Sequence, residues 1–124
     1  MTDVFPACVF SAFRKLGVKK WHIARVAGFG DYALSRHLRL GFLSNELPVR
    51  LAYYAAFALC LENVENITEF VRKSDAELSE ARQEKRAEIA TKISTVAEAD
   101  YIKSWADWAE TVLSPAEAVD DVDD

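Results

Sequence analysis

The fold is decided by residues 23–38, which read IARVAGFGDYALSRHL. Two short helices that cross steeply need a small residue where they touch, and Ala24 supplies it. They also need a residue that tolerates positive φ at the turn, and Gly28 supplies it four positions later. On the second helix, Leu34 and Leu38 would anchor the pair to the core. The stretch therefore predicts two crossed helices around a glycine turn.

Helical spacing of apolar residues predicts further helices on both sides of this pair. We expect helices at about residues 6–16, 19–27, 31–40, 48–61 and 64–72. Gly17, Gly28 and Gly41 would end the first three, and Pro48 suits the first turn of the fourth. The chain has only 4 Gly and 3 Pro in 124 residues, so it has few tight turns. This scarcity favours an all-α fold over a many-stranded β fold.

A long helical segment follows Ser74, which forms a capping-box pattern with Glu77. No Gly or Pro interrupts the chain from there to Pro115. Two apolar stripes run along this segment: Ile89, Ile93 and Val96, and then Tyr101, Trp105, Trp108 and Val112. The stripes are out of register with each other. Either the helix breaks near residues 98–100, or it presents two faces to two partners.

The two stripes form the expected dimer or partner interface. Two tryptophans and a tyrosine on one stripe of a polar helix must be buried against another surface. They could cover the N-terminal part of the same chain. Equally, they could meet the same helix of a second subunit in a homodimer.

Charge is distributed unevenly along the sequence. Residues 1–50 carry eight Lys or Arg against three acids, a net charge of +5. Residues 51–124 carry seven Lys or Arg against seventeen acids, a net charge of -10. Such asymmetry is typical of a basic contact surface on an otherwise acidic protein, although a merely solvated basic face is the alternative.

The residues Ala24, Gly28, Leu34, Ser35, Arg36 and Gly41 carry a family resemblance. With them the sequence resembles the Cro/lambda-repressor-type (Xre) helix-turn-helix family over about residues 4–72. The resemblance implies an all-α, five-helix helix-turn-helix domain of lambda-repressor-like type at residues 1–73. A helical dimerisation or interaction region would follow at 74–114, and a disordered acidic tail at 115–124.

The resemblance also implies a sequence-specific transcriptional regulator, such as a repressor, that binds double-stranded DNA. A homodimer formed through the C-terminal helix would suit two-fold related half-sites on that DNA. A recognition helix at about Asp31–Arg39 would enter the major groove. The expected base-reading residues are Tyr32, Ser35 and Arg36, and the expected phosphate contacts are Lys19, Lys20 and Trp21. Arg25 and Arg39 would add positive charge toward the DNA.

Other sites are not expected. His22 and His37 have no nearby Cys or His with which to bind zinc, and we expect no metal and no cofactor. Cys8 and Cys60 both have apolar neighbours and no adjacent base, which predicts two reduced thiols in a cytoplasmic protein rather than a nucleophile. No run approaches the roughly 20 apolar residues of a membrane helix. We therefore expect a protein that is not an enzyme and has no membrane segment.

A second function remains open. The chain could be a protein-interaction module, such as an inhibitor, an adaptor or an antitoxin of phage or plasmid origin. It would keep the helix-turn-helix scaffold and bind a protein partner through its acidic C-terminal helix. A combination of the two is an antitoxin-like repressor.

Overall fold

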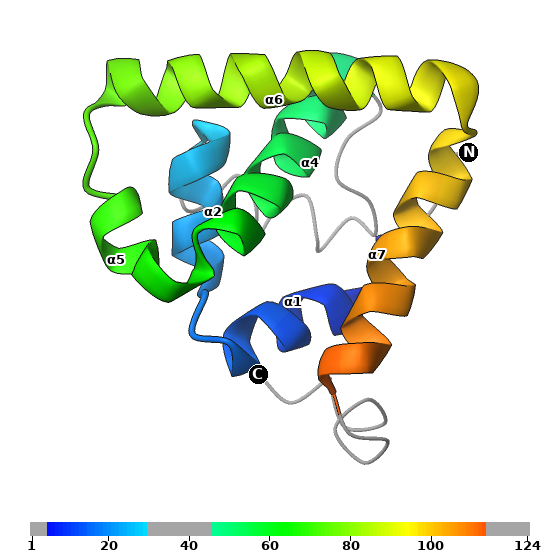
Figure 1. Ribbon diagram of the computed structural model, residues 1–124, viewed down its shortest axis with the longest axis horizontal. Coiled ribbons are helices and arrows are strands. Elements are labelled where there is room, and N and C mark those ends of the chain that lie inside the picture. The colour runs from blue at the N-terminus through cyan, green and yellow to red at the C-terminus, as the bar shows by residue number, and fades with distance from the viewer. Residues whose placement is uncertain (1–4, 30–45, 114–124) are drawn as a thin grey trace.

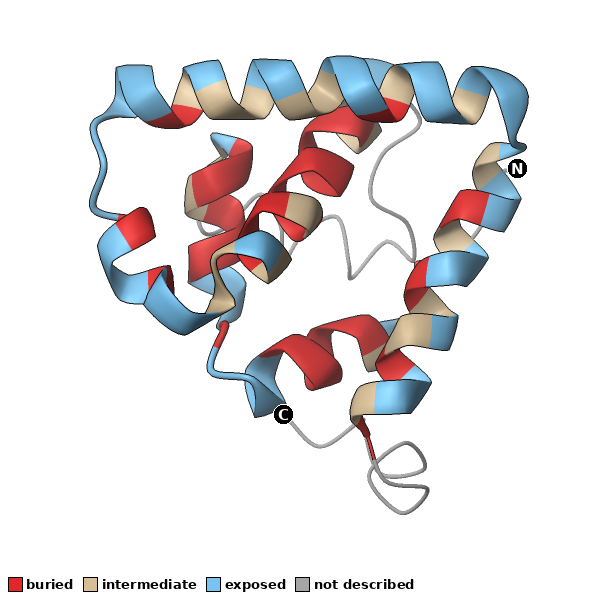
Figure 2. Cartoon of the chain, in the orientation of Figure 1, coloured by how far each residue is buried: buried red, intermediate tan, exposed pale blue. Residues whose placement is uncertain are grey.

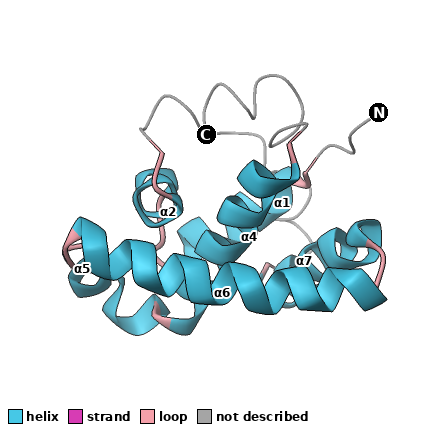
Figure 3. Ribbon diagram, turned by 90° about the horizontal axis from the view of Figure 1, so that it is seen from above, coloured by secondary structure: helices cyan, strands magenta, loops and turns pink. Residues whose placement is uncertain are grey.

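The computed structural model describes residues 5–29 and 46–113. Within these ranges all regular secondary structure is helical, and no strand occurs (Figure 1 and Figure 3). This confirms the all-α class for the described part of the chain. The helix expected at 31–40 and the tail expected at 115–124 lie outside the described residues, as do Tyr32, Ser35, Arg36 and Arg39.

The first two helices are α1 (Ala7–Lys15) and α2 (Lys20–Ala27), whose limits lie within one residue of those expected. Gly17 lies between them at φ +92°, a conformation that glycine adopts without the penalty a Cβ would cause. The N–H of Val18 then donates back to the carbonyl of Phe13 at 2.8 Å. This short turn sets α2 at an angle to α1, and the apolar face of each helix packs into the core.

The central helix is α4 (Leu47–Glu62), with Pro48 in its first turn. Five consecutive side chains in its middle are fully buried: Tyr53, Tyr54, Ala55, Ala56 and Phe57. A helix that is apolar on nearly all sides must be surrounded, and Figure 2 shows α4 almost wholly buried along its middle. Helices α2 and α6 both pack directly against it.

The helix expected at residues 64–72 is shorter in the structure. It consists of a 3-10 turn, η1 (Val64–Asn66), and a single turn of α-helix, α5 (Ile67–Phe70). Ile67, Phe70 and Val71 still pack into the core, as their spacing predicts.

The long segment is divided into α6 (Asp75–Thr95) and α7 (Glu98–Val112). The capping box is confirmed: the Glu77 N–H donates to the Ser74 hydroxyl at 3.1 Å, and the Ser74 N–H donates to the Glu77 carboxylate at 3.0 Å. Val96 then takes an extended backbone conformation, so the helix breaks there. Of the two alternatives for the stripes, the break is therefore correct, and it lies just before the residues expected.

The break changes the direction of the chain. Helix α6 packs across α4, whereas α7 turns away and packs on α1 (Figure 1). Each helix turns a different apolar stripe inward, which accounts for the change of register. The result is one continuous core, to which the N-terminal and C-terminal helices both contribute.

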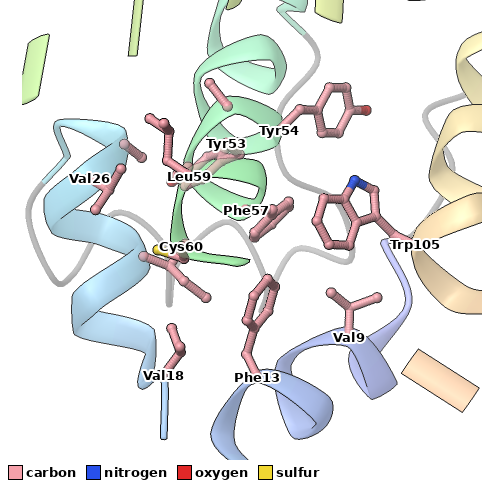
Figure 4. Close-up of a cluster of buried hydrophobic side chains, with 14 of the residues drawn as sticks. Val9, Phe13, Val18, Val26, Tyr53, Tyr54, Phe57, Leu59, Cys60 and Trp105 are labelled. Atoms are coloured by element: carbon pink, nitrogen blue, oxygen red, sulfur yellow. The ribbon is translucent and has the colours of Figure 1, made fainter. Parts of the chain in front are cut away.

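Aromatic rings fill the middle of this core. Phe57 of α4 lies 5.6 Å from the Phe10 ring and 6.0 Å from the Phe13 ring, and Trp105 of α7 lies 5.8 Å from Phe57. Figure 4 shows Phe13, Phe57 and Trp105 converging from three different helices. The helices are thus held together by large apolar surfaces in direct contact.

Both cysteines are free thiols, as expected. Cys60 is fully buried, and burial alone raises the pKa of its thiol to about 12, so the nucleophilic thiolate is suppressed. In the described part of the chain, no helix is both long and apolar enough to span a bilayer.

Candidate nucleic-acid interface

The turn between α1 and α2 gathers positive charge on the surface. Arg14 and Lys15 end α1, and Lys19 and Lys20 begin α2; all four side chains are exposed. No Asp or Glu occurs anywhere between residues 5 and 29. We refer to Arg14, Lys15, Lys19 and Lys20 as the basic turn. The fold tolerates these four like charges because each side chain is accessible to water and counterions, which screen their repulsion.

The start of α2 adds a second attraction for anions. Its N-cap position holds Lys19, which has no side-chain oxygen to accept from the first-turn N–H groups. Unpaired N–H groups and the helix dipole make such an end a favourable place for a phosphate. The basic turn surrounds this helix end with ammonium groups of the same sign.

His22 stabilises the same end from inside. Its Nδ1 accepts the backbone N–H of Lys19 at 2.8 Å, so this nitrogen must be unprotonated. Burial and the nearby Lys19 charge both lower the pKa of His22, which keeps the ring neutral at neutral pH. The sequence left His22 without a role, although its position three residues after the N-cap is where a capping side chain is found.

Trp21 is the most exposed aromatic side chain of this region. It retains 48% of its surface accessible, and its ring lies 4.0 Å from that of His22. Leu16, at 39% exposure, is a second apolar side chain near the basic turn. Between the basic side chains, Phe10, Val18 and Ile23 line the floor of a hollow of about 250 Å³. The surface thus offers apolar contact together with charge.

Arg25, expected at the DNA, is engaged within the protein. Its guanidinium donates to the Val71 carbonyl at 3.1 Å and to the Lys73 carbonyl at 2.7 Å, and it also pairs with the carboxylate of Asp75. Val71 and Lys73 belong to the connection between α5 and α6, and Asp75 is the first residue of α6. The structure therefore gives Arg25 the role of fastening α2 to that connection.

Arg82 secures the other end of α2. Its guanidinium donates to the Val26 carbonyl at 2.7 Å and lies beside Gly28, which has φ +87°. A cation at a helix C-terminus satisfies its free carbonyls and opposes the helix dipole. The chain leaves α2 here toward residues 30–45, which contain the expected recognition helix and lie outside the described residues.

The structure places most of the expected dimer residues against the same chain. Ile89, Tyr101 and Trp105 are buried, and Ile93, Trp108 and Val112 are partly buried. The Trp108 ring lies 4.8 Å from that of Phe13 in α1. Of the two alternatives for the aromatic stripe, the structure therefore has the first: the stripe packs against the N-terminal part of the same chain. Val96 alone among these residues is exposed, at 43%.

An ion-pair network absent from the sequence interpretation joins α4 to α7. The Arg50 guanidinium donates to both oxygens of Glu98, at 2.6 and 3.0 Å, and the Tyr54 hydroxyl donates to the same carboxylate. Arg50 lowers the pKa of Glu98 through these bonds, and Tyr54 adds to the effect. The partners are more than forty residues apart, so no local spacing in the sequence reveals the pairing.

Comparisons with protein-family models, with curated proteins and with solved structures gave no match to this chain. In the part of the chain that the structure describes, no group of three or more His, Cys, Asp or Glu side chains is arranged to hold a metal ion. The basic turn and the α2 N-terminus form a described surface that is suited to phosphate ligands.

Proposed function

We propose that this protein is a sequence-specific regulator of transcription that binds double-stranded DNA. The observation that carries the proposal is the basic turn, four exposed cations without an acid in residues 5–29, set around the N-terminus of α2. Phosphates are the ligands that such a surface attracts. The resemblance of residues 4–72 to the Cro/lambda-repressor-type family supports the same function.

In this proposal the contacts divide into two kinds. Lys19, Lys20 and the exposed edge of Trp21 meet the phosphate backbone and orient the protein. Tyr32, Ser35, Arg36 and Arg39 lie on the recognition helix proposed at residues 31–39 and read base edges in the major groove. Arg25 acts indirectly, because it holds α2 in place through the connection between α5 and α6.

We also propose that the protein acts as a homodimer, which would match two-fold related half-sites. Tyr101 and Trp105 are buried in the core, so the subunit contact would use the more accessible of the expected interface residues. Val96 is the most exposed of these. Light scattering across a range of concentrations measures the oligomeric state directly. A Val96→Asp variant should weaken the dimer and leave the monomer folded.

The test of DNA binding is an anisotropy titration of labelled duplex from upstream of the protein's own gene, compared with a scrambled duplex, over a series of salt concentrations. Affinity should fall steeply with salt, because bound phosphates release counterions. Lys19→Ala should reduce the slope of log affinity against log salt by about one, with little change in sequence preference. Arg36→Ala should cost about 1–3 kcal/mol on the preferred duplex and relax the preference.

The matched control is Lys103→Ala, which removes one exposed lysine from α7, far along the chain from the basic turn. It should leave both the salt slope and the sequence preference unchanged. Equal binding of all duplexes at every salt concentration, or no binding of any, would overturn the proposal.

A second candidate, the protein-interaction module, is favoured by the surface of α6. Only Leu78 and Ile89 of its 21 residues are buried, and the rest of the helix carries a long accessible face rich in charge (Figure 2). Such a protein would retain a stoichiometric partner during purification from its native cells. It would keep that partner when Arg36 and Arg39 are both changed to Ala, whereas a DNA-binding regulator would lose its DNA.

A further inference from the structure

A groove of about 450 Å³ lies where α4, α6 and α7 meet, and the proposed DNA binding does not use it. Its apolar lining includes Ile89 of α6, Leu61 of α4, and Trp105 and Trp108 of α7. Pockets for small molecules span roughly 300–1,000 Å³ and are lined mainly by apolar and aromatic side chains. The groove has both properties.

The two indoles define the shape of the apolar wall. The ring centroids of Trp105 and Trp108 are 5.3 Å apart and their planes meet at 87°. Trp105 also packs on Phe57, and Trp108 on Phe13, and these contacts restrict the rotation of both indoles. A rigid corner of this kind offers a flat apolar body both a face and an edge to pack on.

The charged side chains at the groove differ in how far they are exposed to solvent. The Lys85 side chain is only 16% exposed, whereas its carboxylate partners Glu62 and Glu88 are 53% and 66% exposed. The positive charge of Lys85 also acts on the buried Tyr101 hydroxyl, where it opposes the rise in the pKa of that group caused by burial. Of these three charged side chains, the lysine is therefore the least exposed and the two acids are more accessible to solvent.

Lys92 adds a second ammonium with no acid of its own. Its Nζ lies 5.9 Å from the centroid of the Tyr101 ring, and it forms no ion pair with any residue in the described ranges. A ligand carboxylate could pair with Lys92 without displacing an existing partner. An organic cation would instead meet Lys92 as a like charge, because Glu62 and Glu88, the two acids that line the groove, are already paired with Lys85.

We propose that this groove is a binding site for a small amphipathic carboxylate. The apolar body of the ligand packs in the corner between Trp105 and Trp108, and its carboxylate pairs with Lys92. The ligand class is an aromatic or cyclic acid with a single anionic group, small enough for a cavity of about 450 Å³.

Three probes with one ring system test the proposal: naphthoate, naphthamide and naphthylmethylammonium. Each is titrated into the full chain by isothermal calorimetry at neutral pH. Naphthoate should bind most tightly, by up to about fivefold over the neutral amide, the range of a partly exposed ion pair. The ammonium probe should bind most weakly, because it meets the Lys92 ammonium while both acids of the groove are paired with Lys85.

Variants separate the contributions of charge and shape. Lys92→Gln should remove the preference for naphthoate over naphthamide and leave the amide affinity unchanged. Ser104→Leu places a larger side chain in the groove from an exposed position of α7 and should abolish binding of all three probes. Lys103→Gln, also on α7 but paired with Asp107 and outside the groove, is the matched control and should bind as the original chain does.

Equal affinity for the three probes, tightest binding of the cation, or no binding at millimolar concentration would overturn the proposal. So would an Lys92→Gln variant that still prefers naphthoate. Thermal unfolding of each variant verifies that the fold is intact. None of these measurements involves DNA, so their outcome is independent of the proposed function.

Discussion

Two residues at the start of α2, Lys19 and His22, have different effects on the stability of this helix end. Lys19 is exposed and lies among other positively charged side chains of the basic turn. The buried His22 instead stabilises the same helix end by accepting the Lys19 N–H at 2.8 Å. A protonated imidazole could not accept that bond. The capping role of His22 therefore depends on its neutral form, and this predicts a particular pH dependence.

Because the pKa of His22 in the folded protein lies below the ordinary value of 6.5, the unfolded chain takes up a proton first as pH falls. The contribution of His22 to stability is fully present above pH 6.5 and is lost as pH falls through the folded pKa. The free energy of unfolding should thus decline as pH falls below about 6.5. Urea unfolding at a series of pH values measures this decline.

His22→Asn is the matched variant, because its amide oxygen can replace Nδ1 as acceptor and does not titrate. Its unfolding free energy should change less over the same pH interval than that of the original chain. An identical pH dependence in the two proteins would contradict the role assigned to His22.

At the scale of elements, α2 is held at its C-terminal end by a residue from a distant helix. Gly28 and Gly17 follow α2 and α1 with nearly the same positive φ, +87° and +92°. They differ in surroundings: a Cβ at Gly17 would meet nothing within 4 Å, whereas one at Gly28 would meet the Arg82 guanidinium at 2.8–3.0 Å. The pair therefore separates backbone strain from a tertiary contact.

Gly17→Ala should destabilise the protein by about 1 kcal/mol, the cost of a Cβ in the left-handed region. Gly28→Ala should cost more, because it also displaces Arg82 from the Val26 carbonyl, a bond worth about 1.5–3 kcal/mol when one group is charged. Chemical denaturation measures both. In an Arg82→Ala background the two alanine substitutions should have equal effects, and a persistent difference would argue against the Arg82 contact.

At the scale of the whole molecule, the break after α6 matters because α7 closes the fold. Helix α7 is held to α1 by aromatic packing and by a hydrogen bond from the Lys15 ammonium to the Val112 carbonyl at 3.1 Å. It is held to α4 by the bonds of Glu98 to Arg50 and Tyr54. One set of contacts thus joins the last described helix to the first, and the other joins it to the central helix α4.

Glu98→Gln should lower the free energy of unfolding at neutral pH by about 1–3 kcal/mol, since it removes the carboxylate charge that pairs with the partly buried Arg50. The folded pKa of Glu98 lies below the ordinary 4.5. The stabilisation is therefore fully present above pH 4.5 and is lost as pH falls through the folded pKa. The difference between the two proteins should accordingly shrink in acid.

Glu110→Gln, at an exposed position of the same helix, provides the control for charge alone. It should change stability by less than about 0.5 kcal/mol at any of these pH values. A comparable loss in both variants would show that net charge, rather than the Arg50 pairing, is responsible.

The features of the fold that sequence reasoning predicted all depend on neighbours in the chain. The limits of α1 and α2 follow from apolar spacing and from the glycines after them, and the start of α6 follows from Ser74 and Glu77. The burial of α4 follows from its nearly unbroken apolar composition. Accumulation of Lys and Arg before residue 29 likewise predicted the basic turn.

Only the tertiary structure decided how these elements are joined. It showed that Arg25 and Arg82 hold α2 in place through hydrogen bonds. It also showed that Glu98 pairs with Arg50 and that the indoles of α7 pack on α1. The sequence alone determined where helices form and where positive charge gathers, because helix signals and charge are properties of adjacent residues. The joining contacts link residues about fifty or more positions apart, and only packing in three dimensions selects among the many such pairs that the sequence allows.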